Sequence, residues 1–429
     1  MRIKNINEAE KSIHEYFRRV RIHDYLPAQM IYSLGSYPAK ISAKPTDYDR
    51  ALLTDMAKKG VQLIQVHEEW NDAVRLYGGD KFNAPDKEGM KEFVKLCHEL
   101  GMKIIAYVSS GYFQETDPDF REEFCRYDKV FACNYFKYRK GCHGSAPWRE
   151  YIIPKTFYVM DEYGFDGIFN DWGYDNTHGG KDGGLPDYDP ELEDLLSIIY
   201  SGVKERGGIY KLHCDRNNAP PCKDRVYDYL WIGEWVEDSP IGVGKDYPTY
   251  VVPCLDRHRS DKMTQKEHFA YTIPFLQFPL LKHGRPLLGD NVDLPNVTYY
   301  GGDEQEFFKD VKAYIDKNPN GPYVYSLWSS IPDDVTEYDV WCEYLALYKP
   351  MVTENSLCYV DVKDCDWVET KENVVCSLFV NERIYMVLSN LSKDVCSLSL
   401  HGNWRDRQTG KALQNVTLSP NQIIFLIKD

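Results

Sequence analysis

The chain has 429 residues, 43% of them hydrophobic and 27% charged, which is the balance of a folded globular protein with a sizeable core. Its formal net charge of −15 excludes the basic surface that nucleic-acid phosphates require. Because no apolar run approaches about eighteen residues and no apolar signal segment opens the chain, we expect a cytoplasmic protein without a membrane span.

Short apolar runs alternate with helical patterns through the central part of the chain, which is typical of βα units around a parallel sheet. The strands expected in chain order are 29–34, 61–66, 103–108, 165–169, 209–214, 229–232 and 249–254, with either 286–288 or 323–327 as the eighth. The helices expected between and after them are 47–59, 87–100, 148–163, 190–206, 265–281, 303–317 and 339–348. A long insertion is expected at 109–147.

The pattern changes near residue 353. Short β-rich runs separated by turn residues follow at 374–380, 384–388, 396–400 and 422–427, as in a small antiparallel β-sandwich. We therefore predict an α/β fold, a (β/α)8 TIM barrel with an N-terminal extension in residues 1–352 and a C-terminal antiparallel β-sandwich in residues 353–429.

Twelve cysteines are scattered along the chain without a repeating spacing, and we expect them to be reduced thiols. The tightest cluster is Cys125, Cys133, Cys142 and His143, and its spacing is not that of a zinc site. We expect neither a metal nor another cofactor.

Aromatic residues are abundant, with 33 Tyr and 9 Trp. Sugar rings stack on aromatic faces, so this composition favours a small-molecule carbohydrate as the partner, without nucleic acid or membrane. Tyr and Trp are equally ordinary residues of cores and rims, and that alternative stays open. Whether the chain forms a homo-oligomer also stays open.

A barrel of this kind brings the side chains at the C-terminal ends of its strands to one mouth. Carboxylates, histidines, tryptophans and one arginine follow several of the expected strands. They are His67, Glu68, Glu69 and Trp70 after the second strand, Asp171 and Trp172 after the fourth, His213, Asp215 and Arg216 after the fifth, Glu234 and Trp235 after the sixth, and Asp256 and His258 after the seventh.

Glycoside hydrolysis uses two carboxyl groups, one ionised and one held protonated. Asp171 ends an apolar strand and is the candidate for the ionised group, with a helix cap as its alternative role. Glu234 is the candidate acid, because Trp231 and Trp235 would desolvate it and raise its pKa. Its alternative is an ion pair with Arg216 or Arg257.

The remaining residues of the mouth suit the recognition of sugar hydroxyl groups and rings. For His213, a role as an ordinary histidine of the barrel interior stays open. The residues that we expect to bind substrate are Glu68, Glu69, Trp70, Trp172, His213, Asp215, Arg216, Trp235, Asp256 and His258.

Two segments resemble motifs of known glycosidases. The segment 163–171, YGFDGIFND, resembles the motif that carries the nucleophile in family 31 glycoside hydrolases of the α-glucosidase and α-galactosidase type. The segment 231–234, WIGE, is similar to the W-x-G-D segment that carries their acid/base, with Glu in place of Asp, and Arg216 matches an arginine before it. The sequence is also similar to bacterial barrel proteins grouped as hypothetical glycosyl hydrolases. The resemblance implies a glycosidase-type barrel and a retaining mechanism.

Three readings of the function follow. The first is a retaining glycosidase in which Asp171 attacks and Glu234 protonates the leaving group; at a wider carboxyl separation of roughly 6.5–9.5 Å, Asp171 would be the base of an inverting enzyme. The second is a metal-dependent hydrolase, lyase or isomerase that uses His67 and His213. The third is a barrel that binds carbohydrate without catalysis.

Overall fold

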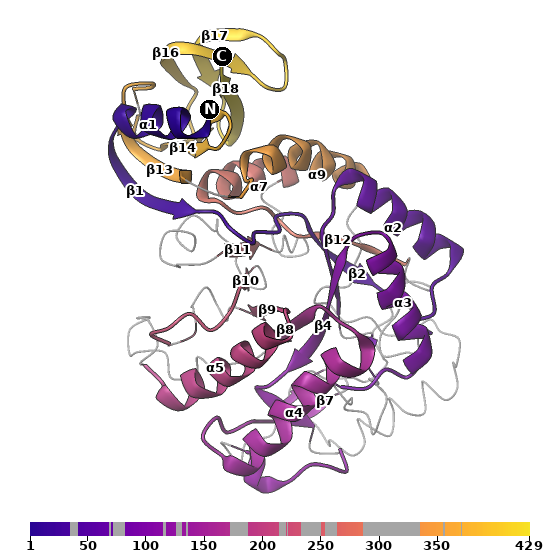
Figure 1. Ribbon diagram of the computed structural model, residues 1–429. Helices are drawn as coiled ribbons and strands as arrows, with labels where there is room; N and C mark the ends of the chain where they lie inside the picture. Colours follow the sequence, from indigo (N-terminus) through magenta and orange to yellow (C-terminus); the bar gives the residue numbers. More distant parts are fainter. Residues whose placement is uncertain are drawn as a thin grey trace. The chain divides into compact units, whose positions relative to one another are not determined.

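The computed structural model of the protein describes residues 1–34, 42–67, 70–71, 82–114, 117–125, 131–133, 136–171, 188–213, 220, 222–232, 250–253, 264–285, 335–354, 357–369 and 371–429 (Figure 1). They fall into two compact units. The first lies within 1–28, 233–281 and 334–429, and the second within 29–232 and 282–333. Among the helices described, none is both long and apolar enough to cross a membrane.

The second unit is built on a parallel sheet that runs β10-β9-β8-β4-β3-β2-β12. The pairs from β2 to β10 are parallel, and nearly every residue of these strands is buried. The bounds are β2 Gln29–Ser33, β3 Leu63–Val66, β4 Lys103–Ser109, β8 Gly167–Asp171, β9 Ile209–His213, β10 Tyr229–Ile232 and β12 Leu281–Gly284. All six strands expected between residues 29 and 232 are therefore present.

Four helices alternate with these strands and lie outside the sheet (Figure 1). They are α2 (Asp47–Lys59), α3 (Lys87–Glu99), α4 (Ala146–Tyr163) and α5 (Pro190–Glu205). Helix α2 has the bounds that its sequence predicts, because a capping box at Thr46 begins it and Gly60 ends it at a φ of 100°.

The insertion expected at 109–147 folds as a small antiparallel sheet in the order β5-β7-β6. Its strands are β5 Tyr112–Gln114, β6 Phe131–Cys133 and β7 Phe136–Lys140, and a 3-10 turn lies at Glu122–Phe124. The insertion follows β4 directly and therefore extends from the C-terminal end of that strand.

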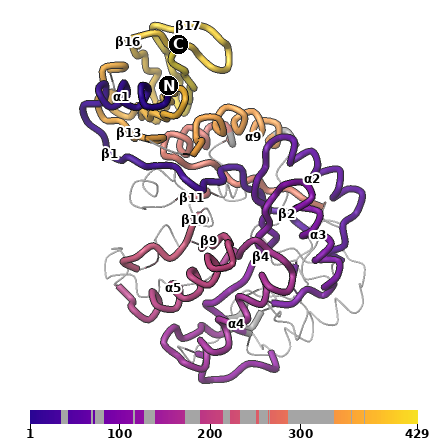
Figure 2. Tube along the Cα trace, in the orientation of Figure 1, coloured from indigo at the N-terminus to yellow at the C-terminus, as the bar shows by residue number. Residues whose placement is uncertain are grey.

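The first unit contains a seven-stranded antiparallel sheet in the order β1-β13-β14-β15-β18-β16-β17. We expected residues 1–28 to extend the barrel, but they belong to the first unit, where they form α1 and the edge strand β1 of this sheet. Figure 2 shows indigo β1 beside orange β13. The division of the chain at residue 352 stays a prediction. The bounds are α1 Arg2–Ser12, β1 Ile13–Arg21, β13 Leu357–Cys365, β14 Val374–Val380, β15 Ile384–Asn390, β16 Cys396–Asp406, β17 Ala412–Leu418 and β18 Gln422–Lys428.

The helix expected at 265–281 is shorter than predicted. Helix α7 (Gln265–Thr272) ends in a 3-10 turn at Ile273–Phe275, and β12 begins at Leu281. Pro274 cannot continue the helix, and Leu276 adopts a left-handed φ of 62°. Strand β12 lies next to β2 in the sheet.

The remaining elements of the first unit are β11 (Tyr250–Pro253), α9 (Val335–Tyr348) and a 3-10 turn at Lys349–Met351. Strand β11 matches the seventh expected strand and α9 the last expected helix. The segments 286–288, 303–317 and 323–327, predicted as strand, helix and strand, lie outside the described residues.

A buried ion pair joins α2 to the residue that follows β12. The side chain of Asp49 has no exposed surface and accepts hydrogen bonds from Nε and Nη2 of Arg285, at 3.0 and 2.8 Å, and from the hydroxyl of Tyr32. Arg285 also donates to the carbonyl oxygens of Leu34, Ser42 and Lys44. This cluster ties the edge of the parallel sheet to its first helix.

We expect Asp49→Asn to lower the free energy of unfolding by about 3 kcal/mol, because the substitution leaves the guanidinium of Arg285, whose side chain is only 15% exposed, without its counter-charge. Urea denaturation followed by circular dichroism measures the change. The matched control is Asp161→Asn, which breaks the exposed pair with Arg206 and should cost less than about 1 kcal/mol. Equal losses in the two variants would contradict the assignment.

Candidate active site

The hydrogen-bond register of the parallel sheet decides which side chains share a face. Phe169 of β8 lies in register with Tyr107 of β4 and with Lys211 of β9. Because side chains alternate between faces along a strand, the residues two positions further on share that face as well. The polar and aromatic residues on it at the C-terminal ends of β3, β4, β8, β9 and β10 are His67, Tyr107, Asp171, His213 and Trp231.

Asp171 is the last residue of β8 and lies at the centre of this group. The residue is 9% exposed, and its carboxylate is held on both oxygens. Nδ1 of His213 lies 2.6 Å from Oδ1, and the hydroxyl of Tyr107 donates to Oδ2 at 2.8 Å. The same hydroxyl is 2.9 Å from that of Tyr112 at the start of β5. These bonds hold the carboxylate in a single orientation.

The surroundings of Asp171 favour its ionised form. Burial raises the pKa of this carboxyl, but the charge and hydrogen bond of His213, the hydrogen bond of Tyr107 and the charge of His67 lower it. The net pKa lies below its ordinary value. At neutral pH the site therefore holds a carboxylate anion.

Aromatic rings line the group on both sides of the carboxylate. The ring centroids of His213 and Trp231 are 4.5 Å apart, and those of Trp231 and Phe169 are 5.4 Å apart. On the other side His67 lies 4.9 Å from the ring of Tyr107. The indole Nε1 of Trp231 is buried and has no hydrogen-bond partner within the described part of the chain. A buried donor without a partner is uncommon.

A polar layer lies below the group on the same face of the sheet. Lys211 precedes His213 by two residues, is fully buried, and donates to Oε1 of Gln29 at 3.0 Å. Its Nζ also lies 5.9 Å from the ring of Phe169. The Lys211 side chain thus belongs to the interior layer below the Asp171 carboxylate.

Asn170 has a different role from that of its neighbour Asp171. Its side chain points to the opposite face of the sheet, where Nδ2 donates to the hydroxyl of Tyr210 at 2.6 Å and to Oγ of Ser110 at 2.7 Å. Its Oδ1 accepts from the backbone N–H of Ser110. Asn170 therefore fixes the ends of β4 and β8 against each other.

The structure brings together two of the predicted site residues, Asp171 and His213. Trp70 is buried in the core, where its indole N–H donates to the Tyr107 carbonyl at 2.7 Å and its rings pack on Tyr163 and Phe165. A side chain this buried does not present a ring face to a sugar, contrary to the stacking role predicted for Trp70. The other predicted residues lie outside the described part of the chain: Glu68, Glu69, Trp172, Asp215, Arg216, Glu234, Trp235, Asp256 and His258.

The sequence pattern does not single out Tyr107, and it places His67 at the mouth and as a possible metal ligand but not among the substrate-binding residues. Both lie on the inner face, but Tyr107 is inside the apolar run 103–108 and reads as an ordinary core residue. Ser109 pairs with Asp171, and side chains alternate along the strand, so Tyr107, two residues before Ser109, lies on the same face as Asp171. That placement requires the register between strands.

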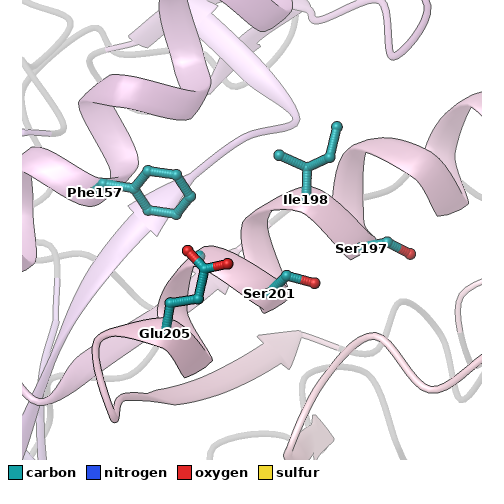
Figure 3. A pocket seen from close by; sticks show the side chains of 6 residues that line it. Phe157, Ser197, Ile198, Ser201 and Glu205 are labelled. Carbon is teal, nitrogen blue, oxygen red and sulfur yellow. The ribbon is translucent and has the colours of Figure 1, made fainter.

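A surface hollow lies elsewhere, between α4 and α5 (Figure 3). Phe157 enters from α4, and a Cβ on Gly202 of α5 would lie 2.1 Å from its ring, so a larger residue at 202 would require Phe157 to move. The lining residues are Phe157, Ser197, Ile198, Ser201, Gly202 and Glu205. These six include a single carboxyl group, so the hollow does not offer the two acids that glycoside hydrolysis uses.

Within the described ranges, no group of three His, Cys, Asp or Glu side chains is arranged to hold a metal ion. This statement covers Cys125, Cys142 and His143 of the cysteine cluster.

Solved structures match nearly the whole chain at low sequence identity. The maltogenic α-amylase AmyB from Thermotoga neapolitana is 12% identical, with 94% of this chain and 99% of that chain covered and a TM-score of 0.55. An α-amylase from Geobacillus thermoleovorans, solved with acarbose, is 10% identical, with 94% and 98% covered and a TM-score of 0.56. The α-glucosyl transfer enzyme XgtA is 12% identical, with 94% and 99% covered and a TM-score of 0.59. No protein-family model and no curated protein matches the sequence.

These likenesses show the fold. The chain is an α/β protein with a (β/α)8 barrel and a C-terminal antiparallel β-sandwich domain, so the predicted fold class is confirmed. In chain order β8 is the fourth strand of the barrel, which places Asp171 at the C-terminal end of strand four. The matched structures are α-amylases and a glucosyl transfer enzyme, and they do not support a specific placement in family 31.

The lowered pKa of Asp171 makes a prediction about stability. Because the folded pKa lies below the unfolded value of about 3.9, the carboxylate contributes stability above that pH and loses it as the pH falls through the folded value. The free energy of unfolding of the wild type minus that of Asp171→Asn should therefore decrease from about pH 5 downward. Urea denaturation at each pH measures it, and a difference that stays constant would contradict the prediction.

Proposed function

We propose that the protein is a glycosidase that hydrolyses the O-glycosyl bond of a small oligosaccharide or glycoside. The observation that carries the proposal is the buried carboxylate of Asp171 on the inner face of the sheet, held by His213 and Tyr107. Working residues of barrel enzymes lie at the C-terminal ends of the strands, where Asp171 is found. The fold, shared with α-amylases, supports the same class of reaction as an analogy.

In the proposed mechanism, Asp171 is the nucleophile and Glu234 the acid/base. Asp171 forms a bond to the anomeric carbon while the bond to the leaving oxygen breaks, and Glu234 gives its proton to that oxygen. Glu234 then takes a proton from water, whose oxygen attacks the anomeric carbon and releases the Asp171 carboxylate. The anomeric configuration is retained. If the two carboxyl groups are further apart, Asp171 instead activates water and the configuration inverts.

Several side chains are proposed to bind the sugar. The N–H of Trp231, which has no partner among the residues that the structure describes, supports a hydrogen bond to a sugar oxygen, and the adjacent aromatic rings support contact with its C–H faces. The residues proposed from the sequence for the same role are Glu68, Glu69, Trp172, Asp215, Arg216, Trp235, Asp256 and His258.

The class of substrate follows from the chemistry of the site and from the matched structures. One matched α-amylase was solved with acarbose, and the amylase AmyP was solved with maltose, 11% identical to this chain at a TM-score of 0.52. Both ligands support an oligosaccharide as the substrate. We also propose a likeness to family 31 in the motifs, a bacterial source and a cytoplasmic location.

We expect Asp171→Gly to lower the turnover of an aryl glycoside on the order of a thousandfold or more, because the attacking group is lost. Sodium azide should restore turnover and yield a glycosyl azide. Glu234→Gln should lower turnover by about 10²–10⁴-fold. Proton NMR of the first product gives its anomeric configuration, and inversion in the wild type would assign Asp171 as base.

The control for these variants is Asp161→Asn on α4, an exposed carboxyl outside the inner face, which should leave turnover unchanged. If the wild type binds sugars but turns over no α- or β-glycoside of a broad aryl panel, the barrel is non-catalytic and the proposal is wrong. Loss of turnover after EDTA dialysis would instead support the metal-dependent alternative.

A further inference from the structure

The contact between Asp171 and His213 joins the ends of two neighbouring strands. Nδ1 of His213 and Oδ1 of Asp171 are 2.6 Å apart, and their side chains are only 10% and 12% exposed. The register of β8 and β9 brings the two residues together, because Asn170 pairs with Leu212. Two titratable groups this close and this buried titrate as one system.

The imidazole is held in place by packing. Its ring lies 4.5 Å from that of Trp231 at an interplanar angle of 59°, and 6.2 Å from that of Phe169. Both neighbours are almost fully buried. Nδ1 of His213 is engaged by Asp171 and is not available to a sugar hydroxyl, so the predicted hydroxyl-binding role would fall to Nε2.

The titratable groups that face this pair come from each strand around it. Tyr107 of β4 donates to Oδ2 of Asp171, Tyr112 of β5 contacts the same tyrosine, and the charge of His67 at the end of β3 favours the anion. Lys211 of β9 lies in the layer below, beside Phe169. Each of these groups is cationic or donates a hydrogen bond, and Asp171 is the acid that they surround.

We infer that His213 is a positioning residue for the Asp171 carboxylate, which it keeps ionised and in one rotamer. The inference deepens the proposed function and depends on it for its catalytic meaning. His213 acts through Asp171 and not through the substrate. Its loss should therefore affect the pH at which Asp171 becomes competent and the rate of the chemical step, and have less effect on the binding of sugar.

The first test needs no substrate. Long-range ¹⁵N–¹H spectra of the histidines, recorded across pH for the full chain, give the titration midpoint of His213, which His213→Asn identifies by loss of its signal. In Asp171→Asn this midpoint should fall by about one to three pH units, because the counter-charge is gone. An unchanged signal of His98, which pairs with Asp166 outside the inner face, reports that the variant is folded. An unchanged midpoint for His213 would overturn the inference.

The second test uses pH profiles of kcat/KM on an aryl glycoside for His213→Asn and His213→Leu. In both variants the acid limb should move to higher pH, since the pKa of Asp171 rises when the imidazolium is lost. The Asn amide can still donate to Oδ1, so kcat should be about tenfold higher in His213→Asn than in His213→Leu. A raised KM with an unmoved acid limb would show that His213 binds substrate instead.

The matched control is His98→Asn. Nε2 of His98 on α3 lies 2.8 Å from Asp166, in a second His–Asp pair that is partly exposed and outside the inner face. This variant should leave the acid limb where it is in the wild type. If the wild type turns over no glycoside, the proposed function fails, and the titration of His213 in Asp171→Asn still decides whether the two groups are coupled.

Discussion

The parallel register of the barrel strands is the constraint on which the site depends. Its tightest point is Gly167, the first residue of β8, where a Cβ would lie 1.9 Å from the carbonyl oxygen of Ile209 and φ is +153°. Only glycine fits so close an approach of two main chains. The approach brings the start of β8 against the start of β9, and four residues later Asp171 meets His213. A contact between backbones thus determines which side chains meet at the mouth.

Polar groups inside a barrel are costly to bury unless each has a partner. Several buried polar side chains of the second unit meet this requirement. Lys211 has the amide of Gln29, Asp171 has His213 and Tyr107, and Asn170 is satisfied on the opposite face by Ser110 and Tyr210. Trp231 at the mouth is one exception among the described residues, and Gln65 of β3 is another, since their buried polar groups have no hydrogen-bond partner. A site built to receive a ligand is where such an exception is expected.

Much of this fold could be predicted from the sequence, and the reasons are local. Thr46 and Gly60 mark the ends of α2, and the apolar runs before Asp171 and His213 mark their strands. The helix predicted at 265–281 is wrong past Thr272, because the segment is apolar as a buried helix would be but contains Pro274, which ends the helix. The site was predictable only in part. Strand order suggested that Asp171 and His213 approach one another, whereas the hydrogen bond between them and the role of Tyr107 require the register, which no single segment contains.

The pairing of β1 with β13 has a consequence for how the chain acquires its structure. Ile13 pairs with Cys365, so the edge of the C-terminal sheet is completed by a strand from the other end of the sequence. During synthesis β1 leaves the ribosome early, and its partner emerges only after the barrel segments between them. Contacts of such large sequence separation slow folding, because a long loop must close before they form. The β domain therefore cannot reach its final form while the chain is still short.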